Sequence, residues 1–437
     1  MIESTTIFLI INMLNGTSYF LISPLIPTLG EKNDFSESVL GWIIGIFPLT
    51  ESIFSTIVPI LSKKFSRVKL LCFGTFFAAT ITILYGILIF IPNRNLLMII
   101  CFSLRIFHGF CAAIITTLIY SLTISFAAKE KTQSSLGKLE IAFAIGNSLG
   151  TVIASVFYKI GGYPLPFFVT GILLFSSFYL SSQINDKNIK KDDDDDEEKT
   201  DNNINYLKYL FYPEIYSILI GFVISMIGLT FYFPSLTYHL TNNYSVSVST
   251  ASLFFIVPKI PNMISLQFLD KISAKLGIYL TFTVALLLTG ISPFFIYPIS
   301  PLPRSLIVII IGFFLMGSGD TPAFISGLVM LSKNIKGIDK SIDEMSANDI
   351  SSVLANIGVE LGDFIGPIIG GYLTDNLGFK MCCFIIALIG LAYSTLIFLF
   401  YNSNIRNDLN KAVCQKEKSE NNKDKNEKDK INHLKNN

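Results

Sequence analysis

The chain alternates long apolar segments with short polar ones over most of its length. A helix needs about 20 mostly apolar residues to cross the hydrocarbon core of a bilayer. Twelve segments reach that length, with bounds near 5–29, 39–61, 70–91, 96–124, 138–160, 164–183, 212–240, 248–269, 277–298, 304–332, 348–374 and 379–401. They are too long and too evenly apolar for the alternating strands of a membrane barrel. The pattern therefore predicts an all-α membrane protein with twelve transmembrane helices.

Prolines inside these segments predict kinks, because proline has no N–H to donate and its ring clashes with the preceding turn. They are Pro24, Pro48, Pro59, Pro234, Pro258, Pro261, Pro322 and Pro367. Several of the twelve segments also exceed the minimum length, so we expect them to tilt or bend within the bilayer.

Charged residues are scarce and unevenly placed. They make up 15% of the 437 residues, and the formal net charge is +1. Such a chain lacks the basic face of a nucleic-acid binder, so nucleic acid is not an expected partner. The loops on the side of the two termini hold 17 Lys and Arg, whereas the opposite loops hold five. Because cytosolic loops carry the excess of positive charge, both termini are predicted to be cytosolic.

Two charged segments divide the chain. Residues 185–211, with five consecutive Asp, are predicted to be an acidic cytosolic linker between an N-terminal half (1–184) and a C-terminal half (212–402). Residues 403–437 are rich in Lys, Glu and Asn and are predicted to be a disordered cytosolic tail. A divalent-ion or partner-binding role for the linker stays an alternative, although nothing in it fixes a coordination geometry. No metal site or cofactor is expected.

The two halves carry a matching glycine pattern. Helix 5 contains EIAFAIGNSLG (Glu140–Gly150) and helix 11 contains NIGVELGDFIG (Asn356–Gly366). One constant offset along the chain places Gly146 on Gly362, Gly150 on Gly366 and Gly162 on Gly378. Within each helix, with Gly370 added in helix 11, the glycines recur at every fourth position, on one face, where two backbones can approach closely. They indicate a duplicated six-helix unit; the glycine faces either serve packing alone or form a gating contact between the halves.

Several motifs resemble those of a known transporter family. ISPLIP (Ile22–Pro27), GWIIGIFPLTES (Gly41–Ser52) and the GKLE of helix 5 with its glycines resemble motifs of vesicular amine transporters. GDFIGPIIGGYL (Gly362–Leu373) is similar to the glycine-proline motif of proton-linked drug and amine antiporters of the major facilitator superfamily. The resemblance covers about 5–401 and looks closest to the vesicular polyamine-transporter-like branch. It implies two six-helix halves and a secondary active transporter, not an enzyme.

The chain departs from that family at residues that matter for chemistry. The resemblance places an Asp in helix 1 and another in helix 11, where this chain has Asn15 and Asn356. The loop after helix 2 has Lys63 where the superfamily usually has Asp, whereas the loop after helix 8 keeps Asp270. These differences favour altered coupling and argue against a monoamine specificity.

Ionisable residues inside the predicted spans each need a reason, because a charge at the bilayer centre costs ~3 kcal/mol or more. They are Glu51, Arg105, His108, Glu140, Lys259, Asp320, Glu360 and Asp363. Five acids against two fixed bases give an acidic interior, which suits a cationic substrate or proton exchange. Asp320 and Glu360 are the main candidates for exchanging a proton with the substrate. The wider set of substrate or proton-coupling candidates adds Asn356, Asn15, Glu140 and Glu51.

The remaining charged residues are candidates for charge pairs or gating: Arg105, His108, Lys259, Asp363 and Asp270. Helices 5 and 8 face each other in the family that the motifs resemble, as do helices 2 and 11, so we expect a Glu140–Lys259 pair and a contact of Glu51 with helix 11. His108 serves either as a hydrogen-bonded packing residue or as a proton relay. Asp363 either joins the site or bonds across the interface.

The leading hypothesis is a proton-coupled antiporter that moves an organic cation, polyamine-like amines first, through a cavity between helices 1, 4, 7 and 10. Aromatic side chains that can stack on an ammonium are Tyr19, Phe20, Phe231, Tyr232 and Phe233. An uncoupled facilitator of a neutral or anionic metabolite and a non-transporting receptor of the same fold remain alternatives. The expected partners are a small solute, protons and the lipid bilayer, and the protein is expected to be a monomer.

One sequence signal bears on topology. Asn243-Tyr244-Ser245 is a glycosylation sequon in the predicted non-cytosolic loop between helices 7 and 8. A second sequon, Asn15-Gly16-Thr17, lies within helix 1 and is expected to stay unmodified. The sequence leaves open whether the membrane is that of a vesicle or the plasma membrane.

Overall fold

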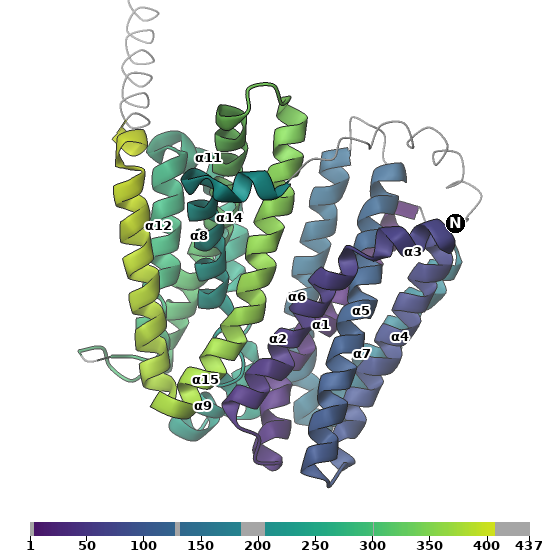
Figure 1. Cartoon of the computed structure of the whole chain (residues 1–437). Helices are drawn as coiled ribbons and strands as arrows, with labels where there is room; N and C mark the ends of the chain where they lie inside the picture. The colour runs from purple at the N-terminus through teal and green to yellow at the C-terminus, as the bar shows by residue number, and fades with distance from the viewer. Residues whose placement is uncertain (1–3, 127–131, 185–205, 300, 407–437) are drawn as a thin grey trace, which may run out of the picture.

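The computed structural model describes residues 4–126, 132–184, 206–299 and 301–406 (Figure 1). Its regular secondary structure over these residues is helical. The N-terminal group of helices comprises α1 (Ser4–Lys32), α2 (Glu37–Ser55), α3 (Val58–Lys64), α4 (Arg67–Ile87), the short 3₁₀ helix η1 (Leu88–Phe90), α5 (Arg94–Phe126), α6 (Thr132–Gly161) and α7 (Pro164–Ser182).

The C-terminal group begins with the 3₁₀ helix η4 (Tyr206–Phe211). It continues with α8 (Pro213–Thr230), α9 (Leu236–Tyr244), α10 (Val248–Leu253), α11 (Lys259–Leu276), α12 (Ile278–Ile291), α13 (Pro293–Ile296), α14 (Leu306–Ile338) and α15 (Glu344–Phe400). Figure 1 shows the two groups side by side, the first in purple to blue and the second in teal to yellow.

Ten helices of the described chain are long and apolar enough to cross a membrane. One of them, α15, contains two of the predicted spans, because Gly378 has a positive φ of 82° that breaks the helical path. The remaining predicted span corresponds to α10 and α11, which are separated by a turn over 254–258. The prediction of twelve spans is therefore confirmed.

Prolines explain where the spans are interrupted. Pro234 and Pro258 lie in the turns that separate α8 from α9 and α10 from α11, and Pro59 is the second residue of α3, just after the turn that ends α2. A residue that precedes proline is pushed out of the helical region, and proline itself cannot donate to the preceding turn. The helices run on through the prolines in α1, α2, α14 and α15, namely Pro24, Pro27, Pro48, Pro322 and Pro367.

The glycine repeat has the same structural role in both halves. A side chain at Gly146 or Gly150 of α6 would overlap the backbone of α1, at Met13 and Thr17 respectively. Their counterparts at Gly362 and Gly366, together with Gly370, lie equally close to α8 and the residue that follows it, at Val223, Thr230 and Phe231. Gly162 and Gly378, which the same offset superposes, both turn the chain with a positive φ, of 66° and 82°.

These contacts join helices of the same half, so the five predicted glycines serve packing. The alternative of a gating contact between the halves is wrong for them. Different glycines make the contact across the halves: a side chain at Gly41 or Gly45 of α2 would overlap the backbone of α15 at Pro367 or Phe364, and one at Gly371 of α15 would overlap the carbonyl of Glu37.

The two groups of helices meet along α2 and α15, α6 and α10, and α1 and α9. Hydrogen bonds join the two groups at one end of the molecule. This end is marked by residues 33–36, 245–247 and 375–378. Ser249 Oγ donates to the Ser155 carbonyl at 2.6 Å, and Thr237 Oγ1 donates to the Pro24 carbonyl at 3.1 Å. At the same end the Asp375 carboxylate accepts from the start of α2. In Figure 1 this is the lower end, where α2, α9 and α15 converge.

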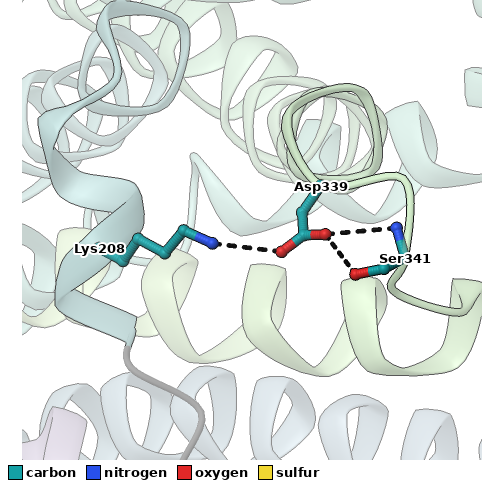
Figure 2. A network of polar contacts seen from close by, with 3 residues as sticks. All are labelled: Lys208, Asp339 and Ser341. Atoms are coloured by element: carbon teal, nitrogen blue, oxygen red, sulfur yellow. Dashed lines mark hydrogen bonds and ion pairs between the residues drawn. The ribbon is translucent and has the colours of Figure 1, made fainter.

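The beginning of the C-terminal group is tied to the end of α14. Lys208 in η4 forms an ion pair with Asp339 at 3.2 Å, and Asp339 also accepts from the hydroxyl of Ser341 at 2.6 Å (Figure 2). Residues 206–211, predicted as the end of the linker, thus form a short helix held by the C-terminal group. The acidic part of the linker and the predicted tail beyond residue 406 lie outside the described residues.

Candidate functional site

One hydrogen bond crosses the interface between the two halves, called the seam below, and joins α1 to α15. The Tyr19 hydroxyl of α1 donates to the Asp363 carboxylate of α15 at 2.6 Å. Tyr19 is positioned by its neighbours, since its ring stacks on Phe143 of α6 and packs against Phe47 of α2 and Phe20. Of the two roles open to Asp363, the structure places it in a bond across the interface.

Arg105 of α5 lies behind Tyr19 and is completely buried. Its guanidinium stands over the ring of Phe47, 4.4 Å from the centroid, and 6.0 Å from that of Tyr19. Within the described chain, its three nitrogen atoms have no hydrogen-bond partner. A buried arginine held by aromatic faces alone is costly, because its five donors have lost their water. Among the described residues Arg105 thus makes aromatic contacts and no ion pair.

His108, one turn further along α5, is buried in a hydrogen-bonded chain. Its Nε2 lies 2.9 Å from Ser18 Oγ, which is 3.0 Å from Thr82 Oγ1. Thr82 in turn donates to the carbonyl of Ala78 at 2.8 Å. The chain connects α5, α1 and α4 within the N-terminal half. The bond of Nε2 suits a packing histidine, whereas the buried Nδ1 has no partner among the described residues, so the choice between packing and proton relay stays open. The sequence does not reveal the bonded chain, because Ser18 and Thr82 come from two other helices.

Three carboxyl groups gather where α2 meets α15. Glu51 of α2 accepts a hydrogen bond from Thr116 Oγ1 at 3.2 Å. Glu360 and Asp363 lie one turn apart on α15, and their charges act on Glu51 and on each other. α2 packs along α15, whereas the hydrogen bond of Glu51 goes to α5, so the contact of Glu51 with helix 11 stays a prediction. The result is an acidic cluster that draws on both halves and sits next to Tyr19 and Arg105.

A second polar cluster lies in the C-terminal half. The Asp320 carboxylate of α14 accepts from the Asn262 amide of α11, and the carbonyl oxygen of the same amide accepts from the Thr321 hydroxyl. Sequence reasoning found no partner for Asp320 and missed Asn262. The only signal for it was its place one turn after Lys259, on the helix that packs against α14.

Lys259 begins α11 and points to the seam. Its Nζ lies 4.7 Å from the ring centroid of Phe20 in α1, which is a cation–π contact between the halves. Phe20 also meets Phe233 edge to face. An aromatic face at the seam therefore already holds an ammonium group, one that belongs to the chain itself.

The predicted Glu140–Lys259 pair is wrong. Glu140 is exposed and accepts from the hydroxyl of Tyr120 at 2.6 Å. The two side chains have other partners. Tyr120 of α5 holds Glu140, and the ammonium of Lys259 rests on the ring of Phe20 in α1.

The other predicted residues take no part in the hydrogen bonds that the structure describes in the two clusters. Asn356 is exposed on α15, one turn before Glu360, and Asp270 is exposed on α11. Asn15 is buried in α1 with 4% of its surface exposed. The neighbouring Asn12, which the sequence did not single out, donates to the Leu139 carbonyl at 2.9 Å and ties α1 to α6.

The sequence of the chain matches the model of the Major Facilitator Superfamily over residues 8–339. The chain belongs to this superfamily. It is 24% identical to the MFS-type transporter SLC18B1 of Homo sapiens over 407 residues, which cover 90% of this chain and 84% of that protein. It is 30% identical to the multi-drug resistance efflux pump PmrA of Streptococcus pneumoniae over 168 residues, 38% of this chain and 40% of the pump.

Solved structures agree on the fold. The crystal structure of the nucleoside transporter NupG superposes with a TM-score of 0.74 at 11% identity, over 92% of this chain and 99% of the transporter. The predicted resemblance to the vesicular amine and polyamine transporter-like branch is confirmed by the similarity to SLC18B1. The protein is a multi-pass membrane transporter for a small solute, and not an enzyme.

Proposed function

We propose that this transporter exchanges an organic cation for protons by alternating access, with amines and polyamines as the first candidates. The observation that carries this proposal is the acidic cluster at the seam. Glu51, Glu360 and Asp363 come from both halves, so rocking of the halves changes the distance between their charges. Acids packed together in an apolar setting cannot all stay ionised, and a cation or protons must compensate them.

The roles within the site follow from its geometry. Glu360, whose carboxylate has no hydrogen-bond partner among the described residues, is the acid that exchanges a proton for the substrate ammonium. Asp320 of α14, kept in place by Asn262, is the second acid proposed to exchange a proton. Tyr19 holds Asp363 through its hydrogen bond, and the buried guanidinium of Arg105 near Tyr19 balances part of the negative charge. Phe20, which already bears the Lys259 ammonium, supplies an aromatic face on which a substrate ammonium can stack.

The larger framework belongs to the same proposal. Residues 1–184 and 212–402 form the two moving halves, and both termini face the cytosol. The protein works as a monomer in a vesicle membrane or in the plasma membrane. The similarity to SLC18B1 and, over a shorter region, to a multi-drug efflux pump supports an organic substrate.

The test is uptake of labelled spermidine into proteoliposomes, with and without an inside-acid pH gradient. The double variant Asp320→Asn with Glu360→Gln is expected to lose the uptake that the gradient drives. Glu140→Gln is the matched control, because Glu140 is exposed and lies outside both clusters. Gradient-driven uptake that survives in the double variant contradicts the assignment.

A second function has one observation in its favour. Asn15 and Asn356 are amides, and Arg105 presents unpartnered donors near the seam. Fixed positive charge without its own counter-ion suits an anionic or neutral metabolite carried without protons. Transport that is independent of pH, with no uptake of spermidine, would favour this facilitator over the antiporter.

A further inference from the structure

Asp375, near the end of span 11, caps the start of a helix in the opposite half. Its Oδ1 accepts from the backbone N–H of Glu37 at 2.8 Å, and its Oδ2 accepts from the backbone N–H of Ser38 at 2.8 Å. The hydroxyl of Ser38 donates to Oδ2 as well. Three donors at the start of α2 thus converge on one carboxylate, which belongs to a residue more than 300 positions later in the sequence.

The start of α2 has few other partners for these groups. The first N–H groups of any helix have no acceptor within the helix. Ser36 satisfies that of Val39, and Asp375 satisfies the two before it. A negative charge at this position also complements the positive end of the helix dipole. The carboxylate therefore replaces water for two N–H groups as long as the halves stay together at this end.

Backbone contact explains how a short aspartate side chain can reach across. Gly371, one turn before Asp375, lies so close to α2 that a side chain there would overlap the Glu37 carbonyl. Two further hydrogen bonds join the halves at this end, Ser249 to Ser155 and Thr237 to Pro24, and both are between neutral groups. Among these links, that of Asp375 carries a full charge, and charge-assisted hydrogen bonds are roughly twice as strong as neutral ones.

We propose that Asp375 is a latch that holds the two halves closed at this end and thereby sets the equilibrium between the two access states. The proposal rests on the rocking of the halves described above, but not on the identity of the solute. Opening at this end pulls Asp375 away from α2, so the carboxylate and both N–H groups must be rehydrated. Weakening the latch therefore favours the state that is open at this end.

The test measures the distance between the halves in the full-length protein in nanodiscs, without solute or pH gradient. Fluorophores are attached through unnatural amino acids at Lys32 and Asn242, which are exposed near this end in opposite halves. In Asp375→Asn an NH₂ group replaces one acceptor oxygen and faces a donor of α2. The long-distance population is expected to rise about tenfold, equivalent to about 1.4 kcal/mol. Asp34→Asn, an exposed acid in the neighbouring turn, is expected to leave it unchanged.

A second pair of variants isolates the backbone bond in case Asp375→Asn does not fold. Glu37→Pro removes the N–H that Asp375 Oδ1 accepts from, and proline is well tolerated at the first position of a helix. Glu37→Ala removes the same side chain but keeps the N–H. The long-distance population is expected to be larger in the proline variant than in the alanine variant. Equal populations in this pair, or a wild-type distribution in folded Asp375→Asn, overturn the latch. Absence of cation uptake by the wild type would instead count against the proposed function.

Discussion

The Tyr19 hydroxyl of one half donates a hydrogen bond of 2.6 Å to the Asp363 carboxylate of the other half. Hydrogen bonds to charged groups contribute roughly 1.5–3 kcal/mol. Tyr19→Phe is therefore expected to weaken the joined arrangement of the halves and to lower gradient-driven uptake about tenfold or more. Tyr120→Phe is the matched control, because it removes a bond of the same length, to Glu140, within one half. Equal uptake by the two variants would contradict a role at the seam.

The ammonium of Lys259 rests on Phe20 at the place proposed for a substrate ammonium. Removing this positive charge is expected to relieve repulsion of a cationic substrate. Lys259→Met should therefore lower the KM for spermidine on the order of tenfold, which corresponds to about 1.4 kcal/mol. Lys259→Arg keeps the charge and should leave the KM close to that of the wild type. A higher KM in Lys259→Met would mean that the lysine supports binding, as the facilitator of an anionic metabolite requires.

Gly370 and Gly371 are neighbours that face different partners. A methyl group on Gly370 would overlap the Phe231 carbonyl within the C-terminal half, and one on Gly371 would overlap the Glu37 carbonyl across the seam. Overpacking of this kind costs typically about 1–3 kcal/mol. Gly370→Ala is thus expected to lower the melting temperature, and Gly371→Ala to widen the distance between the halves at that end.

The control for both variants is Gly337→Ala. Nothing lies within 4 Å of the position that its Cβ would take, and alanine is the better helix former by up to about 1 kcal/mol. This variant should melt at or slightly above the wild-type temperature. A normal melting temperature in Gly370→Ala would show that α8 and α15 can move apart without cost.

Features repeated along the chain were predictable from the sequence, and pairs of side chains from distant segments were not. Apolar length predicted the spans, and the constant offset between the halves correctly matched Gly162 with Gly378, which both adopt a positive φ. The expected Glu140–Lys259 pair failed because each side chain finds a partner on another helix, Tyr120 of α5 for Glu140 and Phe20 of α1 for Lys259. The hydrogen bond of the Ser38 N–H to Asp375 was not predictable either, because it joins two distant segments and neither residue belongs to a recognised motif.

The orientation of the protein can be tested at Asn243. This residue is exposed near the end of α9, and its amide Nδ2 bonds only within its own helix, to His239. If the loop between spans 7 and 8 is non-cytosolic, protein made in a eukaryotic host is expected to carry a glycan there. Treatment with a glycosidase should then shift its mobility on a gel, and Ser245→Ala should abolish the shift. Asn15 is 4% exposed and should stay unmodified. A shift that persists in Ser245→Ala would place the glycan elsewhere.

The ion pair of Lys208 with Asp339 predicts a pH dependence of stability outside the membrane. The Ser341 hydroxyl, the Lys208 ammonium and the Ser341 backbone N–H hold the pKa of Asp339 below its usual range. The contribution of this carboxylate to stability is therefore complete above the usual pKa of aspartate and is lost as the pH falls through the lowered value. Its hydrogen bond with Asp339 raises the pKa of Lys208. The contribution of the ammonium is complete below the usual pKa of lysine and is lost as the pH rises through the raised value.

Lys208→Gln is expected to lower the melting temperature slightly between these two limits and to have no effect at more acidic pH, where Asp339 is protonated in both proteins. The effect is small because the pair lies at the surface, with the Lys208 side chain 52% exposed. The difference in melting temperature between this variant and the wild type should vanish in about 1 M salt, where the Debye length falls to about 3 Å. Lys333→Gln removes an exposed lysine of α14 that has no such carboxylate partner in the described chain. A loss of stability that is equal in the two variants, or that persists at high salt, would show that the pair does not hold η4 to the end of α14.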